Sequence, residues 1–132
     1  MTIFVDTSAI YAVLDRDDVN HAGADRSWRR LLEDGSDLLT TNYVLLEIGV
    51  LLQARIGLVA LRTFHENIAP LLQIDWISEK QHDTAVATVL TADRKKLSVV
   101  DCVSFQSMRE HGVRAAFCFD RHFREQGFET IP

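Results

Sequence analysis

The sequence predicts an α/β domain in which helices cover both faces of a mostly parallel β-sheet. Short β-prone runs alternate along the chain with longer helical patterns, an order typical of parallel strands joined by helical crossovers. Glycine and proline are scarce, with six and two residues, which favours long regular elements and short loops. At 132 residues the chain has the usual size of one domain, so we expect residues 1–132 to form a single domain with its own core.

The beginning of the chain is predicted to hold one strand and two helices. A β-prone run at 2–5 ends at Asp6, and residues 7–14 place apolar side chains on one helical face. Asn20 can cap a second helix over about 20–34, because its side chain can accept a hydrogen bond from a free backbone N–H. Apolar residues at helical spacing form the expected buried stripe of this helix: Ala24, Trp28, Leu31 and Leu32.

The next segment repeats the order of strand and helix. Residues 38–40 form a plausible second strand, after which Asn42 can cap a helix that runs to about Arg55. Gly57 separates this helix from another at 58–68, so the two helices are expected to form a hairpin.

Two later helices begin with a capping box, in which two side chains three residues apart bond each other's backbone N–H groups. Ser78 with Gln81 opens one helix, and Ser98 with Asp101 opens the other. Their expected ranges are 78–91 and 98–110. The remaining strands are expected at 72–76, at 114–119 just before Asp120, and within the tail 123–131.

Four acidic residues stand where a carboxylate is costly, namely Asp6, Glu47, Asp101 and Asp120. Asp6 and Asp120 follow predicted strands, and the carboxyl ends of parallel strands border the ligand crevice of such sheets. Glu47 and Asp101 interrupt apolar runs, where an uncompensated buried carboxylate costs several kcal/mol. Clustered carboxylates repel one another, and a divalent cation such as Mg²⁺ would compensate them because it prefers oxygen ligands. The chain has no HxH, HExxH or paired CxxC spacing, so zinc is disfavoured.

Each of these acids also has a purely structural interpretation. Glu47 could belong to an ordinary buried ion pair, and Asp101 is accounted for by its capping box. Asp6 is a good helix cap, and Asp120 could be a turn residue. We favour a shared cation because four costly acids are harder to explain one at a time than together.

Composition limits the class of protein. The formal net charge of −5 is unfavourable for a nucleic-acid partner, but setting the four acids aside leaves 15 acidic and 14 basic residues, so RNA is not excluded. Cys102 and Cys118 lie in apolar runs, which predicts buried free thiols. The chain has no signal-peptide pattern and no apolar run of about 18 residues, so we expect a cytoplasmic protein.

The motifs that carry the acids resemble the PIN domain family, and most closely its VapC-type toxins of toxin–antitoxin pairs. The resemblance covers nearly the whole chain and implies a three-layer α/β/α sandwich with a mostly parallel central sheet. It also implies cleavage of RNA that depends on Mg²⁺ or Mn²⁺. The matching segments are FVDTSAIYAVLDRDD at the start, Thr41 to Ile48, KLSVVDCVSF at 96–105 and FCFDRHFREQGF at 117–128.

The resemblance assigns roles to individual residues. The family's catalytic, metal-binding acids fall on Asp6, Glu47, Asp101 and Asp120, and its supporting hydroxyl groups on Thr7 and Ser98. As a hypothesis, Asp6 and Asp101 are the principal metal ligands, while Glu47 completes the shell and orients or deprotonates the attacking water. Asp120 would hold an outer water or a second ion. Many relatives carry threonine two residues before this last acid, where the present chain has Cys118.

The expected partners are the RNA substrate, an antitoxin protein and a second copy of the chain. Basic residues near the acids could contact the RNA backbone, although solvated loops are the plainer alternative: Arg94, Lys95, Lys96 and Arg121. The predicted hairpin at 43–61 carries more apolar residues than one sheet contact requires, which indicates either an exposed patch or close packing between its helices. By resemblance, such a groove receives a helix of the antitoxin, and the protein forms a homodimer.

Three other functions are alternatives to an RNA-cleaving toxin. A non-catalytic PIN-like binding module is disfavoured because all four acids are present. A phosphotransfer or phosphatase domain would need a second acid beside the first or a glycine-rich phosphate loop, and Asp6-Thr7-Ser8 offers neither. A related metal-dependent DNA nuclease is distinguished only by the small size of the chain, which favours RNA.

Overall fold

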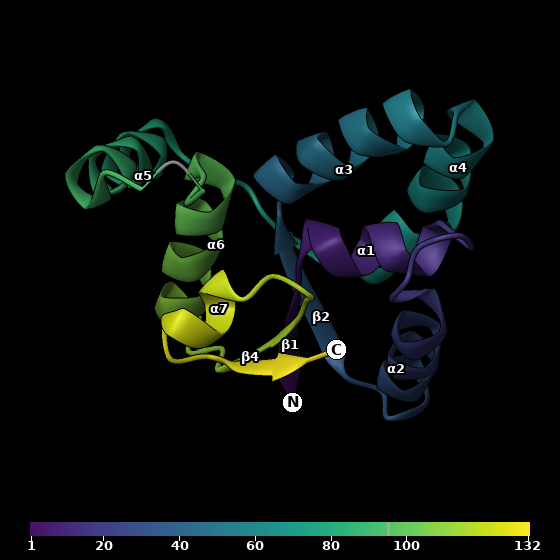
Figure 1. Cartoon of the computed structure of the whole chain (residues 1–132). Coiled ribbons are helices and arrows are strands. Elements are labelled where there is room, and N and C mark those ends of the chain that lie inside the picture. The colour runs from purple at the N-terminus through teal and green to yellow at the C-terminus, as the bar shows by residue number, and fades with distance from the viewer. Residues whose placement is uncertain (95) are drawn as a thin grey trace.

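The computed structural model describes residues 1–94 and 96–132 (Figure 1). Its five strands form one sheet in the order β3-β2-β1-β4-β5, and all four strand pairings are parallel. The strands are β1 (Thr2–Val5), β2 (Asp37–Thr41), β3 (Gln73–Asp75), β4 (Ala115–Phe117) and β5 (Glu129–Ile131). The predicted parallel sheet is therefore confirmed.

Seven α-helices flank this sheet within the described residues. Figure 1 shows α1, α2, α3 and α4 on one side of the sheet and α5, α6 and α7 on the other, so the α/β/α layering is also confirmed. None of the described helices has the length and hydropathy needed to cross a membrane. The helices are α1 (Thr7–Leu14), α2 (His21–Glu33), α3 (Asn42–Arg55), α4 (Leu58–Thr63), α5 (Glu79–Ala92), α6 (Val99–Glu110) and α7 (His122–Glu125).

The order in which successive strands join the sheet reverses at β1. The chain leads from β1 to β2 and β3, then crosses to β4 and β5 on the other side of β1. In a sheet of this kind a crevice opens at the carboxyl ends of the two strands where the order reverses. Those strands are β1 and β4, which pair from Ile3 with Ala115 to Val5 with Phe117.

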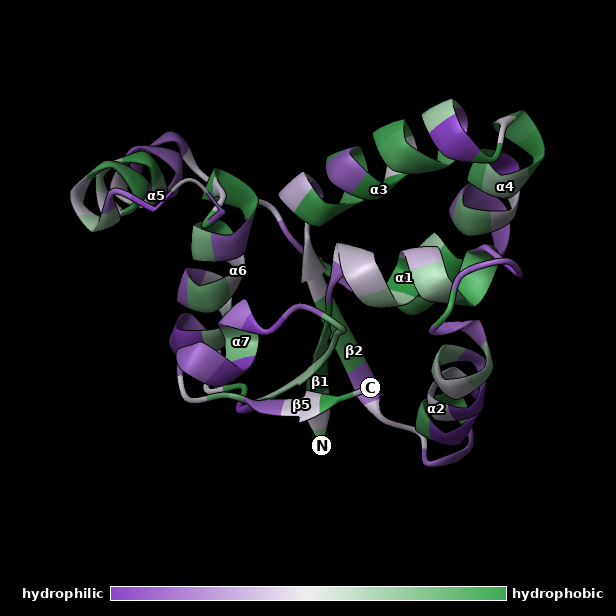
Figure 2. Cartoon of the chain, viewed as in Figure 1, coloured by the Kyte–Doolittle hydropathy of each residue, from purple (hydrophilic) through white to green (hydrophobic). Residues whose placement is uncertain are grey.

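The core is formed by strands that are buried on both faces and by aromatic rings from the carboxyl-terminal part of the chain. Strands covered on both faces carry runs of apolar residues rather than an alternating pattern, and Figure 2 shows hydrophobic colour along β1 and in the middle of β2, where Leu38 and Leu39 are buried. The Phe105 ring meets the Phe123 ring edge-on, with centroids 5.0 Å apart, and Phe123 is fully buried. Cys102 and Cys118 are buried and free, as predicted.

One predicted helix cap is wrong, and a second has the predicted position without the predicted hydrogen bond. The cap of α3 is Thr41, whose hydroxyl accepts a hydrogen bond from the Val44 N–H at 3.2 Å. The Asn42 side chain instead accepts a bond from the Ile77 N–H at 2.8 Å, which ties the start of α3 to the segment after β3. Asn20 does precede α2, but its side chain makes no capping bond.

Other boundaries differ from the prediction for local reasons. The regular helix expected at 58–68 ends at Thr63 and continues as a π-helical turn over Phe64–Ile68. Strand β4 ends two residues early because the Phe119 N–H bonds the Ser8 hydroxyl rather than a neighbouring strand. The short helix α7 was not predicted, since four residues are too few for a periodic pattern. Leu32 is exposed and does not belong to the buried stripe of α2.

The assignment of the α3 cap is testable. Thr41→Val keeps the shape of the side chain but removes the hydroxyl, so we expect the free energy of unfolding to fall by about 1 kcal/mol. Asn20→Ala removes a side chain that makes no capping bond, and we expect a change below about 0.5 kcal/mol. Urea denaturation of both variants measures these changes, and equal losses would contradict the assignment.

Candidate metal centre

Three of the four predicted acids lie together at the carboxyl edge of β1 and β4. Asp6 directly follows β1, Asp101 is the third residue of α6, and Asp120 follows β4. Asp6 is 4% exposed and Asp101 is 8% exposed, whereas Asp120 is half-buried. The charges of Asp101 and Asp120 both act on the Asp6 carboxyl, so the three acids share one electrostatic environment.

Ser8 fixes the Asp6 carboxylate and links the ends of the two strands. Both the backbone N–H and the hydroxyl of Ser8 donate to Oδ2 of Asp6, at 3.2 and 2.6 Å. The Phe119 N–H, from the segment after β4, donates to the same Ser8 hydroxyl at 2.9 Å. Ser8 was not among the predicted site residues, although a serine two residues after a capping aspartate is a recognisable local pattern.

Asp101 is held by the capping box predicted from the sequence. The Ser98 N–H donates to Oδ2 of Asp101 at 3.2 Å, and the Asp101 N–H donates to the Ser98 hydroxyl at 3.0 Å. Within the described part of the chain, the hydrogen bonds to Asp6 and Asp101 all go to Oδ2. Each carboxylate therefore keeps Oδ1 for another partner.

His122 completes the cluster around Asp120. Its backbone N–H donates to Oδ1 of Asp120 at 2.8 Å, and its ring Nδ1 lies 2.8 Å from the same oxygen and 3.7 Å from Oδ2 of Asp101. Among the described residues, the ligand atoms of Asp101, Asp120 and His122 all lie within 4.8 Å of one another. His122 was not among the predicted metal ligands, although it lies two residues after Asp120 in the sequence.

Burial makes these acids hard to ionise without a compensating charge. Burial raises the pKa of Asp6 to about 7, the Ser8 hydrogen bonds oppose this, and the negative charges of Asp101 and Asp120 add to it. Burial also raises the pKa of Asp101, with a further contribution from Asp120. The hydroxyl of Thr7 is buried without a hydrogen-bond partner in the described chain. A crowded set of carboxylate oxygens with these properties fits a divalent cation.

Cys118 lies two residues before Asp120, and its thiol is buried. Burial raises the pKa of its thiol to about 12, and the nearby Asp6 charge adds to the effect. Its Sγ lies 3.9 Å from the main-chain oxygen of Asp120, so the thiol makes only a weak contact there. The chain therefore lacks a strong hydroxyl donor at this position.

Glu47 does not join the three acids in the structure. It is half-buried on α3 and lines an apolar groove, so the prediction of a deeply buried carboxylate is wrong. Its apolar neighbours lie largely at the surface, with Leu46 71% and Val50 57% exposed. Glu47 nevertheless stands near the same edge of the molecule, because Val100, which precedes Asp101, lines the groove too. The groove, called the α3 groove below, is lined by Tyr43, Leu46, Glu47, Val50, Leu51, His82 and Val100.

The structure brings together two of the four predicted RNA-binding residues. Arg94 and Arg121 approach the same carboxylate, that of Glu125, at 3.2 and 3.8 Å. Arg94, Arg121 and Lys96 are exposed. Lys95 lies outside the described residues.

Comparisons with known proteins agree with the fold. The sequence model of the PIN domain matches residues 3–129. Proteins of two Mycobacterium tuberculosis strains, both described as the 23S rRNA-specific endonuclease VapC20, are 30% identical over 98% of this chain and 97% of their own. The crystal structure of VapC20, described as a Sarcin-Ricin loop cleaving toxin, matches with a TM-score of 0.84 over 98% of this chain and 99% of that one. FitAcB from Neisseria gonorrhoeae matches with a TM-score of 0.70 at 13% identity, over 100% of this chain and 97% of that one, and shows the fold alone.

The raised pKa of Asp6 predicts how stability depends on pH. Folded Asp6 titrates near pH 7, whereas its ordinary value is 3.8. Its contribution to stability is therefore complete below about pH 4 and is lost as the pH rises to 7, a change on the order of 4 kcal/mol. Asp6→Asn cannot ionise. The quantity to measure is the unfolding free energy of Asp6→Asn minus that of wild type, obtained by urea denaturation in the presence of a chelator. We expect this difference to rise between pH 4 and 8, because only the wild type loses stability over this range.

Asp37→Asn is the matched control for this measurement. Asp37 is exposed at the amino end of β2, on the opposite edge of the sheet from the site. We expect its difference from wild type to show no comparable trend. If the Asp6→Asn difference stayed flat over the same pH range, Asp6 would not be a buried, hard-to-ionise acid.

Proposed function

This chain belongs to the PIN domain family, and from that premise we propose that it is a metal-dependent endoribonuclease, the toxin of a VapBC-type toxin–antitoxin pair. Its homology to an endonuclease over nearly the full length supports nuclease activity. The observation that carries the proposal is the meeting of Asp6, Asp101 and Asp120 at the crevice between β1 and β4, with a raised pKa at the two buried acids. We propose that residues 1–132 form one nuclease domain and that it acts in the cytoplasm.

Asp6 and Asp101 are the proposed principal ligands of one Mg²⁺ or Mn²⁺, with Asp120 beside them. When bound, such a cation supplies the positive charge that activates water and stabilises the phosphoryl oxygens during hydrolysis. Ser8 and Ser98 hold Oδ2 of the two principal acids, which fixes the direction of each Oδ1. These serines therefore reduce the reorganisation that binding requires.

Glu47 and Thr7 have proposed supporting roles. The half-exposed Glu47 carboxylate is reached by water, so it can orient a water molecule or accept its proton in a way that a fully buried acid could not. The buried Thr7 hydroxyl has no partner in the described chain and can donate to a carboxylate or water at the loaded site.

The proposed substrate is RNA, bound beside the acids by exposed basic residues. Arg94 and Arg121 converge on Glu125, so the two guanidinium groups lie on one surface next to the Asp120 segment. Contacts from such groups to phosphates would position the strand without reading its sequence. Lys95 and Lys96 follow Arg94 in the sequence and are further candidates. Because the relative VapC20 is described as specific for 23S rRNA, ribosomal RNA is the first substrate to test.

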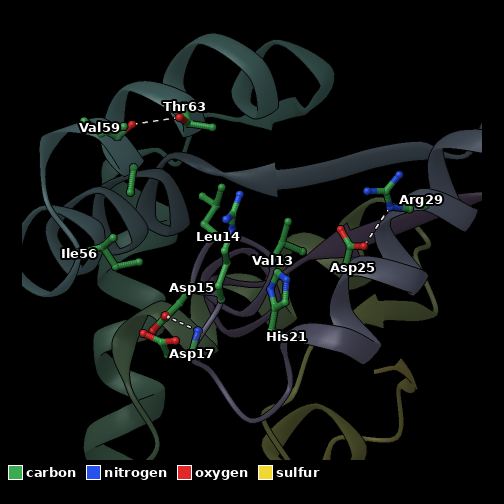
Figure 3. Close-up of a pocket in the computed structure, with 12 residues that line it drawn as sticks. Val13, Leu14, Asp15, Asp17, His21, Asp25, Arg29, Ile56, Val59 and Thr63 are labelled. Atoms are coloured by element: carbon green, nitrogen blue, oxygen red, sulfur yellow. Dashed lines mark hydrogen bonds and ion pairs between the residues drawn. The ribbon is translucent and has the colours of Figure 1, made fainter.

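A partly charged cavity is the proposed binding site of the antitoxin. Figure 3 shows this cavity, of about 650 Å³, between the end of α1, α2 and α4. Apolar Ile56 and Val59, the latter 81% exposed, share it with the ion pair of Asp25 and Arg29. A mixture of apolar and charged side chains suits an amphipathic helix of a partner that also exists alone.

The α3 groove is the proposed homodimer surface. Its cavity of about 610 Å³ is lined almost entirely by apolar atoms apart from Glu47. Figure 2 shows α3 coloured as hydrophobic along much of its length. Interfaces of permanent homodimers are more apolar than those of separable partners, which is why self-association is assigned to this groove and the antitoxin to the charged cavity.

Removal of either principal acid tests the nuclease. Asp6→Asn and Asp101→Asn should each lower the rate of RNA cleavage at least about a hundredfold, because the transition-state charge loses its stabilisation. Cleavage of total and ribosomal RNA with added Mg²⁺ or Mn²⁺ is measured on gels, and circular dichroism checks that the variants fold. Asp37→Asn should cleave like wild type. Full activity in both site variants would contradict the proposal, and equal cleavage of DNA would indicate a DNA nuclease instead.

Two surface variants test the partner assignments. Leu46→Glu places a charge in the α3 groove and should shift the protein from dimer to monomer without loss of antitoxin binding. Val59→Glu should leave the dimer intact and weaken the complex with a coexpressed candidate antitoxin. Light scattering after size-exclusion chromatography measures the mass of each variant alone and the mass of its complex with the antitoxin. The opposite pattern would show that the two surfaces have been interchanged.

A further inference from the structure

We propose that His122 supplies a nitrogen ligand to the cation site, so that the site binds Mn²⁺ more tightly than Mg²⁺. The inference rests on the proposed function, because it takes the cluster of Asp6, Asp101 and Asp120 as the cation site. It adds a ligand that the acidic residues alone do not provide, and with it a preference between the two ions.

The first observation is that the His122 ring is buried without a hydrogen-bond partner. The residue is 6% exposed, and neither Nδ1 nor Nε2 makes a hydrogen bond within the described chain. Buried polar atoms in folded proteins are nearly always paired, because leaving one unpaired costs about 1–3 kcal/mol. The unpaired ring therefore indicates a missing partner, and the adjacent carboxylates show where that partner would bind.

The second observation is the distance of Nδ1 from the two acids. It lies 2.8 Å from Oδ1 of Asp120 and 3.7 Å from Oδ2 of Asp101. The shorter contact has the distance of an ion pair but does not meet the geometry of a hydrogen bond. Ligand atoms about 2.1 Å from one ion in adjacent octahedral positions stand about 3 Å apart, so this spacing matches that of two ligands of the same ion.

The backbone already holds the ring in this position. The His122 N–H donates to Oδ1 of Asp120 at 2.8 Å, and the next residue, Phe123, is fully buried in the core. Asp120 and His122 are therefore oriented together by one short segment. Little further ordering is needed for both to reach the same ion.

The donor set decides which ion is favoured. Carboxylate and water oxygens suit Mg²⁺, whereas an imidazole nitrogen suits transition metals and is a poor ligand for Mg²⁺. The absence of HxH, HExxH and paired CxxC spacings disfavours zinc, but it does not exclude a single histidine ligand. One histidine is sufficient when the other ligands are carboxylates from distant elements.

Pulsed electron paramagnetic resonance on Mn²⁺-loaded protein tests the inference directly. A ligated imidazole couples its nitrogen to the Mn²⁺ electron spins, so we expect nitrogen modulation in wild type that changes when all histidines carry ¹⁵N. This comparison needs no variant. Wild type that binds Mn²⁺ without nitrogen modulation would overturn the inference.

Metal affinities of two histidine variants provide a second test. His122→Asn replaces the nitrogen by an amide oxygen; we expect Mn²⁺ to bind at least about tenfold more weakly and Mg²⁺, measured by competition, to change by less than about threefold. His111→Asn is the control, because this histidine lies near Asp75 at 3.8 Å, away from the site, and both affinities should match wild type. Unchanged Mn²⁺ affinity in folded His122→Asn would overturn the inference.

The same measurements separate this inference from the proposed function. If wild type and His122→Asn bind Mn²⁺ equally while Asp101→Asn does not bind it, the cation site stands and only the nitrogen ligand is refuted. If wild type binds neither ion, both the inference and the proposed metal-dependent nuclease are refuted.

Discussion

Repulsion among three carboxylates in a buried crevice is the constraint on which this structure depends. Asp6, Asp101 and Asp120 come from three separate elements, and the reversal of strand order at β1 brings them to one edge. Burial and mutual repulsion raise the pKa of Asp6, so the cluster is strained at neutral pH unless positive charge is supplied. The folded chain thus holds a cluster that fits the proposed cation.

The residues that hold this cluster also stabilise the local fold. Asp6 and Asp101 each accept helix-capping bonds through Oδ2, so the structural interpretation of each acid and its proposed role in the site are compatible. Ser8 joins the cap of α1 to the segment after β4 through the Phe119 N–H. Secondary structure and site geometry therefore depend on the same few hydrogen bonds, which limits how far the site can move.

Helix α3 has apolar side chains both in the core and at the surface. Helix α3 buries Ile48 and Leu52 against the core, yet it also presents Leu46 and Val50 on its outer side. A helix that is apolar on nearly every face must cover its outer side with another surface or expose it to water. The proposed partners would cover this exposed surface, and Val100 in the lining of the α3 groove brings the proposed self-association surface close to Asp101.

The sequence by itself determined the parallel α/β class, most helices and strands, both capping boxes and the unusual acids, because these depend on neighbours within one or two helical turns. Tertiary structure decided what depends on distant partners. Asn42 bonds Ile77 and leaves the α3 cap to Thr41, and Ser8 bonds a residue 111 positions away. Glu47 lies at a surface groove and His122 beside Asp101 for the same reason: the order of strands sets which segments meet, and no local pattern encodes that order.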